Sequence, residues 1–386
     1  MLPLLPFALL LAILPFPGTV ALRLICLVAA AALAFFSWRK AANRPVIPCK
    51  PALALWIFLA ALSVAYSAIP GYSLGEFKNE IGYTMLAFIS FLVIANKRET
   101  VQHLLVALAA GFTLIGVWAA CAWAANGFIW DQSGRYGGIA VFSTYIVTVV
   151  PALFCLACAG SRPWLRRAAW LLLGLAFLLA LMTLQRAVWP ALLAEVAVIG
   201  FWRYRKGMRS GLVMTAIAVI VIASSFYATS SLRSETLSGM EESVEASLAG
   251  DTRLAAWRGI VAKIAEHPWA GAGFGRGTMG RVYPELIPEN KMISHPHNVF
   301  LNYGIAMGIP GILALAVLFF CLARIFWRQR AEEGLAIYGV CGVALIVGVV
   351  IRNQFNDLFI RDMALLYWAL IGIFLGQAAH LKRVNA

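Results

Sequence analysis

Long apolar segments alternate with short polar segments along almost the whole chain. Most apolar segments have about 16 to 25 residues, which is enough for a helix to cross the hydrocarbon core of a bilayer. We predict twelve such helices, near residues 2–15, 20–38, 51–67, 80–95, 102–125, 138–158, 168–184, 187–202, 211–229, 300–323, 334–351 and 363–379. Only helices and closed barrels satisfy their backbone polar groups in lipid, so the pattern predicts an all-α, polytopic integral membrane protein.

One long polar segment interrupts the predicted helices and divides the chain into three parts. Residues 1–229 contain helices one to nine, residues 230–299 form a large loop, and residues 300–386 contain helices ten to twelve. The first part of the loop, residues 230–250, is rich in Ser and Glu, and we expect a mobile or loosely helical lid. The loop is where we look for chemistry, because it holds most of the acids outside the predicted helices.

Two further features of the loop predict local structure. After Asp251 and Thr252, which are suitable helix caps, apolar residues recur at helical spacing and predict an amphipathic helix that lies on the membrane surface or on the bundle. These apolar residues are Leu254, Trp257, Ile260, Val261 and Ile264. The run from His267 to Gly277 then alternates glycine with other residues, which predicts a flexible loop that approaches other backbone closely.

The composition agrees with a membrane protein and excludes a soluble enzyme. Hydrophobic residues make up 62% of the chain and charged residues 12%, and the mean hydropathy is +0.83, whereas about 25% of residues are charged in ordinary soluble domains. The formal charge of +14 does not indicate nucleic acid, because 18 bases and only three acids fall in segments at one side of the predicted membrane. The positive-inside rule therefore places both termini in the cytoplasm and residues 230–299 in the periplasm.

The predicted outer side carries the histidines that are candidates for chemistry. His295 and His297 precede Asn298, which is a suitable cap for a short helix that ends at the breaker Gly308-Ile309-Pro310-Gly311. The N-terminal dipole of that helix would favour an anion beside His297. The alternative is that both histidines only bond loop carbonyls, and their i, i+2 spacing is a weak signal for zinc.

Three arginines are candidates for anion binding on the same side. Arg186 lies in a short turn between two predicted helices, where an arginine without a nearby acid is either functional or extends to lipid headgroups. Arg253 lies on the predicted loop helix and Arg135 in a polar turn, and either may instead be a solvated charge. Arginine forks match phosphate oxygens in pairs, so these residues point to a phosphorylated substrate.

Two missing motifs restrict the reaction further. The sequence has no G-x-x-x-x-G-K-[ST] phosphate loop and no Asp-x-Asp pair for a divalent ion on a phosphate. A transferase outside the cytoplasm must therefore use an activated substrate such as a glycan on a lipid diphosphate. Arginines would stabilise the diphosphate leaving group in place of a metal, and a histidine would take the proton from the attacking hydroxyl.

These motifs resemble the O-antigen ligase and polymerase superfamily. The resemblance rests on His297-Asn298 followed, after nine residues, by Gly308-Ile309-Pro310-Gly311, on Arg253 with Trp257 and the run from His267 to Gly275, and on Arg186. It covers about 115 residues by motif and the whole chain by its architecture of about twelve helices and one large loop. The sequence has an additional histidine, His295, and the spacing to Gly308 favours His297 as the family's residue.

The resemblance implies a metal-independent, inverting glycosyltransferase of the multi-spanning type in a bacterial inner membrane, without a cofactor. Its implied substrates are an undecaprenyl-diphosphate-linked O-antigen donor and a lipid A-core acceptor, with membrane lipids around it and no nucleic acid. His297 would be the base, and Arg186 and Arg253 would bind the diphosphate. From the residues themselves, we assign Arg135 as a weaker diphosphate ligand and Asn298 as support for the site. We add Asp357, in the next outer turn, as a candidate that orients the imidazole.

Three alternatives stay open at this point. A polymerase that extends the glycan on its carrier, and an enzyme that glycosylates protein, belong to the same superfamily. A transporter is a third possibility, because transporters also have broken helices and arginines at the membrane boundary. The sequence shows no inverted repeat, and its charged residues gather on one side instead of at mid-membrane, so we favour the ligase.

Overall fold

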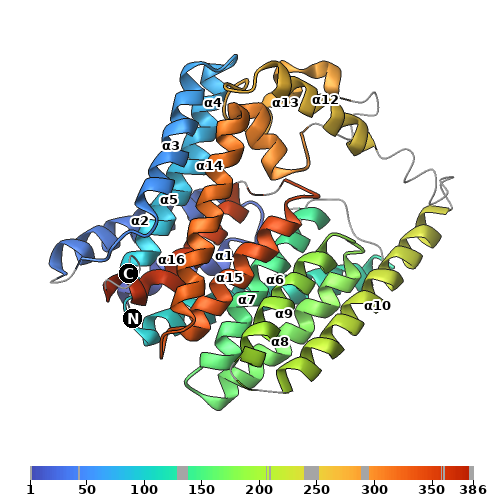
Figure 1. The fold of residues 1–386 in the computed structure, drawn as a ribbon. Coiled ribbons are helices and arrows are strands. Elements are labelled where there is room, and N and C mark those ends of the chain that lie inside the picture. The colour runs from blue at the N-terminus through green and yellow to red at the C-terminus, as the bar shows by residue number, and fades with distance from the viewer. Residues whose placement is uncertain are drawn as a thin grey trace.

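The computed structural model describes residues 2–41, 44–127, 138–205, 207, 210–238, 252–287, 295–357, 359 and 361–381, and every regular element within them is helical (Figure 1). The elements are η1 (Leu2–Leu4), α1 (Leu5–Ile13), α2 (Val20–Lys40), α3 (Lys50–Ala65), α4 (Pro70–Phe77), η2 (Lys78–Gly82), α5 (Tyr83–Ile94), α6 (Arg98–Ala125), α7 (Ile139–Ala159), α8 (Pro163–Met182), α9 (Val188–Arg205), α10 (Ser210–Ser238), α12 (Thr252–Glu266), α13 (Thr278–Val282), η3 (Pro284–Leu286), α14 (Val299–Gln329), α15 (Ala336–Arg352) and α16 (Arg361–His380).

Each of the twelve apolar segments predicted from the sequence coincides with a helix. Among the described residues, seven helices are long and apolar enough to cross a membrane: Val20–Lys40, Pro70–Ile94, Arg98–Ala125, Ile139–Ala159, Pro163–Met182, Val299–Gln329 and Arg361–His380. Lys50–Ala65, Thr215–Ser231 and Ala336–Arg352 are shorter apolar helices. The protein is therefore a polytopic membrane protein. The finer count of twelve spans stays a prediction, because α1 has only nine residues and α9 carries Glu195, Arg203 and Arg205.

Helix α16 lies at the centre of the bundle and is buried along most of its length. It packs most extensively against α5, and Gly372 allows this close approach, since a Cβ there would lie 2.6 Å from the carbonyl oxygen of Phe88. Trp368 of α16 packs between Trp56 of α3 and Phe88 of α5, with ring centroids 5.7 and 5.4 Å apart. The core therefore fixes the start of α16, and with it the α15–α16 connection.

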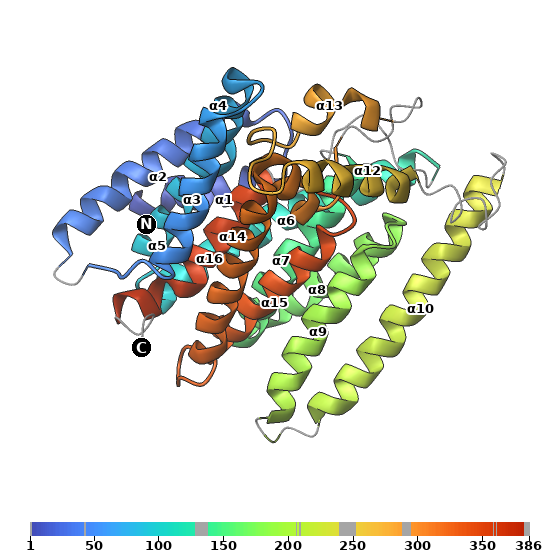
Figure 2. The same cartoon turned by 45° about the horizontal axis from the view of Figure 1, so that its top comes forward.

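The helices separate the long polar segment from the basic connections. Figure 2 shows α12 and α13 at one end of the bundle, together with the α8–α9 and α15–α16 connections. The α9–α10 and α14–α15 connections and the C-terminal end lie at the opposite end (Figures 1 and 2). This is the division that the positive-inside rule predicts from the sequence.

The structure adds two details to the long segment. Helix α10 continues to Ser238, so the segment predicted as a loop from residue 230 begins with about two further helical turns, and residues 239–251 lie outside the described residues. Helix α12 confirms the predicted amphipathic helix, and its Ile260 and Ile264 are buried against Met279 and Ile305. Val261 belongs to the predicted apolar stripe but is not among the residues of α12 that are buried against the bundle.

Val261 is not buried because of the direction from which α12 is covered. The helix packs on α14 along Ala256, Ile260 and Ile264, which are spaced four residues apart and form one narrow stripe. Val261 lies on the next face and is 53% exposed. The side chain of Leu254 lies outside the described part of the chain.

We expect residues 230–299 to face the periplasm and both termini to face the cytoplasm. Single cysteines introduced as Ser238→Cys and Asn385→Cys should then differ in their reaction with a membrane-impermeant maleimide in intact spheroplasts. Ser238→Cys should be labelled and Asn385→Cys should react only after permeabilisation. Labelling of Asn385→Cys alone in intact spheroplasts would invert the orientation.

Candidate active site

The histidine loop joins the long segment to the start of α14. Asn298 caps this helix, because its Oδ1 accepts hydrogen bonds from the backbone N–H groups of Phe300 (3.0 Å) and Leu301 (3.1 Å). This confirms the cap predicted from the sequence. His297, immediately before it, has a φ of +53°, in the left-handed region that few non-glycine residues adopt. The loop therefore turns sharply at His297.

The N–H groups at the start of α14 are already bonded within the protein. The N–H groups of Phe300 and Leu301 donate to Oδ1 of Asn298. The N–H of Val299 donates to the carbonyl oxygen of Asn353 at 2.9 Å. A phosphate bound directly by these N–H groups, as the sequence suggested, would have to displace these bonds. The positive charge for an anion must come from side chains instead.

Helix α14 consists of two helices that meet at Gly308. Gly308 has a φ of +70° and lies inside α14 as its one non-helical position, which confirms the predicted break after the short first helix. A Cβ at Gly308 would lie 2.6 Å from the carbonyl oxygen of Pro268, and the N–H of Ile309 donates to that oxygen at 2.8 Å. The backbone of the glycine-rich loop thus contacts the chain at the break, and the two sequence motifs pack on each other.

The alternating glycines extend this contact to α3 and α4. The N–H of Ala272 donates to the carbonyl oxygen of Ile305 at 2.8 Å, and its own carbonyl oxygen accepts from Ala68 at 3.1 Å. Gly273 has a φ of +115°, and a Cβ there would meet the Ser67 hydroxyl at 2.0 Å. The predicted close approach of the loop is confirmed, and its physical reason is that backbone packs on both sides.

Helix α12 contacts the histidine loop through one indole. The Nε1 of Trp257 donates to the carbonyl oxygen of Pro296, between the two histidines, at 2.7 Å. Arg253 precedes Trp257 by four residues, so it lies on the same face of α12, about one turn away. The side chain of Arg253 lies outside the described residues.

Arg276 brings a guanidinium to the two histidines. It follows the glycine run, and its Nη2 contacts Nε2 of His295. The rings of His295 and His297 stack with centroids 3.8 Å apart and an interplanar angle of 32°. A guanidinium only donates hydrogen bonds, so Nε2 of His295 is the acceptor in this contact. The nearby cation also disfavours the charged form of His297, which therefore suits a proton acceptor.

Buried carboxyl groups lie on the other side of Arg276. Asp357, in the α15–α16 connection, is 1% exposed. Burial raises the pKa of Asp357 to about 6, while the positive charge of Arg276 acts in the opposite direction. Burial also lowers the pKa of Arg276, and Asp357 and Glu80 oppose that shift. Glu80 lies in the π-helical turn η2, and such turns are frequent at functional sites.

The site residues predicted from the sequence differ in where the structure places them. Asn298 and His297 lie together, and the Nδ2 of Asn298 donates to Oε1 of Gln354 at 3.1 Å, in the connection that carries Asp357. Arg186 is partly exposed in the α8–α9 turn, at the same end of the bundle as α12 (Figure 2), and its guanidinium has no hydrogen bond or ion pair with another described residue. Arg135 lies outside the described residues, so its role stays a prediction.

Arg276 and the acidic pair Glu76 and Glu80 were not predicted from the sequence as site residues. Glu76 lies 3.7 Å from Nη2 of Arg361, and Glu80 is 5% exposed. A signal was present, because two carboxylates at i, i+4 spacing in an otherwise apolar helix are costly unless they have partners. His295 also belongs to this cluster, because it contacts Arg276 and stacks on His297.

Within the described residues, no group of three or more His, Cys, Asp and Glu side chains is arranged to hold a metal ion. The polar groups of this cluster are the stacked imidazoles of His297 and His295 and the guanidinium of Arg276, on which the charges of Asp357 and Glu80 act. Together they can hold an anion and accept a proton from a neutral hydroxyl.

We expect the transfer rate to fall as the pH decreases through about 6. Below this pH, Asp357 becomes protonated and no longer balances the charge of Arg276. Asp357→Asn should lower the rate at pH 7.5 roughly tenfold, as for a coupling of about 1.4 kcal/mol between neighbouring groups. The measurement is kcat/KM against pH for both proteins.

Glu266→Gln, on the exposed end of α12, is the matched control and should leave the profile unchanged. Equal rates and equal pH profiles for Asp357→Asn and wild type would remove Asp357 from the site.

A comparison with known families bears on the part of the chain that holds these residues. The family described as Wzy_C: O-Antigen ligase matches residues 170–316. The match includes Arg186, Arg253, Arg276, His297 and Gly308. No curated protein matches the chain.

The matched family consists of membrane glycosyltransferases of the O-antigen ligase and polymerase type, which agrees with the hydrophobic helices described above. Residues 170–316 of this membrane protein are therefore an O-antigen ligase family domain.

Proposed function

We propose that the protein joins an undecaprenyl-diphosphate-linked O-antigen to the lipid A-core oligosaccharide on the periplasmic face of a bacterial inner membrane. The family match over residues 170–316 supports a lipid-linked glycan as the donor class. The protein is then a ligase, and the reaction is a single displacement that inverts the configuration at the anomeric carbon.

His297 takes the proton from the acceptor hydroxyl in this mechanism. The hydroxyl oxygen then forms a bond to the anomeric carbon of the donor, while the bond from that carbon to the diphosphate oxygen breaks. The undecaprenyl diphosphate leaves with the electron pair, and arginines stabilise its charge. Arg186, Arg253 and Arg135 are the proposed diphosphate ligands.

The observation that carries the proposal is the position of His297 between an arginine and two family motifs. Its ring stacks on His295, which contacts Arg276, and its backbone leads directly into the capped helix that ends at Gly308. A neutral imidazole near fixed cations is the arrangement that a general base for a phosphorylated donor needs. In this proposal, Asn298 and Asp357 help to position His297.

The polymerase and the protein-glycosylating enzyme use the same donor chemistry, so the acceptor distinguishes them. A transporter is less well supported, because the match is to a family described as O-antigen ligase, and because the histidine–arginine cluster lies beside α12 and the start of α14, at one end of the bundle.

We expect purified protein to transfer glycan from the lipid-linked donor to lipid A-core in the presence of EDTA and without nucleotide. Arginines replace a metal in this mechanism, and the donor is already activated, so neither addition should be needed. The measurement is the mobility of the acceptor in a gel after incubation with donor, with donor-only and acceptor-only reactions as controls.

Loss of transfer in EDTA that returns with magnesium or manganese would contradict the metal-independent mechanism. Growth of the glycan in the donor-only reaction would identify a polymerase instead of a ligase.

A further inference from the structure

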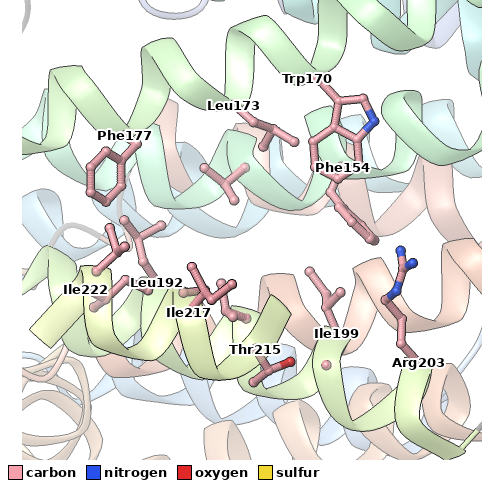
Figure 3. Close-up of a pocket in the computed structure, with 15 residues that line it drawn as sticks. Phe154, Trp170, Leu173, Phe177, Leu192, Ile199, Arg203, Thr215, Ile217 and Ile222 are labelled. Atoms are coloured by element: carbon pink, nitrogen blue, oxygen red, sulfur yellow. The ribbon is translucent and has the colours of Figure 1, made fainter. Parts of the chain in front are cut away.

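A large apolar groove lies between α7, α8, α9 and α10, away from the histidine cluster. It has a volume of about 410 Å³, within the range of about 300–1,000 Å³ of small-molecule sites. Figure 3 shows Phe177 and Ile222 at one end and Phe154, Trp170 and Arg203 at the other. We call this groove the α7–α10 groove.

The groove is open to the surroundings of the bundle at its edges. Trp170 of α8 is 45% exposed and Ile217 of α10 is 56% exposed. At the Arg203 end, α9 and α10 approach closely, since a Cβ on Gly200 would lie 1.9 Å from Oγ1 of Thr215. The opening therefore lies between α8 and α10, on a face that the hydrophobic helices present to the hydrocarbon core.

Arg203 is the charged residue among the described residues that line the groove. Its Nε is buried and has no hydrogen-bond partner in the described part of the protein. An arginine that only extends to the headgroup region would point out of the bundle, whereas Figure 3 shows the guanidinium pointing across the groove toward Phe154 and Trp170. The groove thus combines a long apolar wall with one positive end.

We propose that the α7–α10 groove binds an anionic glycerophospholipid, with an acyl chain along the apolar wall and its phosphate on Arg203. The acyl chain matches the aromatic and aliphatic lining, and the guanidinium matches phosphate oxygens in a bidentate manner. Arg203 lies at the end of α9 opposite the α8–α9 turn, so the proposed phosphate position is separate from the proposed donor site and does not depend on the proposed function.

The test measures phospholipid bound to the purified full-length protein by native mass spectrometry. Dioleoyl phosphatidylglycerol is titrated against dioleoyl phosphatidylcholine, and wild type is compared with Arg203→Gln and Arg205→Gln. Arg205 is two residues further along α9 and exposed, so it is the matched control for surface charge. Ala218→Trp fills the groove without changing charge.

We expect one phosphatidylglycerol to bind to wild type in preference to phosphatidylcholine. Arg203→Gln should weaken it about tenfold, the loss expected for one charge-assisted interaction, while Arg205→Gln changes affinity less than about twofold. Ala218→Trp should prevent binding of both lipids. If that variant does not fold, the comparison of Arg203→Gln with Arg205→Gln decides alone.

Three results would overturn the proposal. Equal losses in Arg203→Gln and Arg205→Gln would mean general attraction to a basic surface. Equal binding of both phospholipids would mean that Arg203 does not select charge. Displacement of phosphatidylglycerol by an equimolar amount of undecaprenyl phosphate would identify the carrier lipid as the occupant.

Discussion

His297→Asn should abolish detectable ligation while the protein still inserts and binds donor. General-base catalysis contributes about 10² to 10⁴-fold, and Asn lacks a group that accepts the proton. Asparagine is the informative replacement because it tolerates the left-handed backbone that His297 adopts at φ +53°. The measurements are the transfer rate and the donor affinity of purified protein at matched abundance.

His267→Ala is the matched control for His297→Asn. His267 lies at the exposed end of α12, outside the histidine cluster, and its loss should leave the rate unchanged. His295→Ala should have a partial effect, because His295 positions His297 through stacking and contacts Arg276. An inactive His295→Ala together with an active His297→Asn would reverse the assignment of the base, and loss of donor binding in His297→Asn would refute the base role.

Arg186→Ala and Arg253→Ala should each reduce transfer by about 100-fold or more. In the proposed mechanism, each change would remove two charge-assisted hydrogen bonds to the leaving diphosphate, and each such bond is worth about 1.5–3 kcal/mol. Arg→Lys keeps the charge but loses the planar fork, so we expect a loss of about tenfold at either position. Arg135 should follow the same order with a smaller effect. The measurement is kcat/KM with the lipid-linked donor.

Arg258→Ala is the matched control on α12, since Arg258 is exposed and five residues from Arg253. It should behave like wild type. If Arg186→Ala and Arg253→Ala also insert normally and transfer at the wild-type rate, both residues are surface charges and the diphosphate must be held by others, of which Arg276 is the first to examine.

The positions of the helices were predictable because each one must bury its backbone in lipid and is therefore a continuous apolar segment. The same holds for the start and the break of the short helix in α14. Asn298 and Gly308 act within a few residues of their own position, through a side-chain cap and a left-handed φ. Local chemistry of this kind is visible in the sequence.

The partners of Arg276 were not predictable, because they depend on contacts between distant segments. Arg276 reaches His295 only because the glycine-rich loop packs between Ser67 and the α14 break, which orders residues more than 200 positions apart in the sequence. Asp357 and Glu80, whose charges act on the same arginine, belong to two further segments of the chain. In the sequence, Arg276 is one more basic residue in a polar loop.

Deletion of the gene followed by gel analysis of the cell's lipopolysaccharide tests the central claim most directly. We predict loss of every O-antigen-capped form, with polymer retained on its lipid carrier, and recovery by the wild-type gene but not by His297→Asn. Lipopolysaccharide capped with single repeats would mean that the protein is a polymerase, and an unchanged lipopolysaccharide pattern would contradict the ligase assignment.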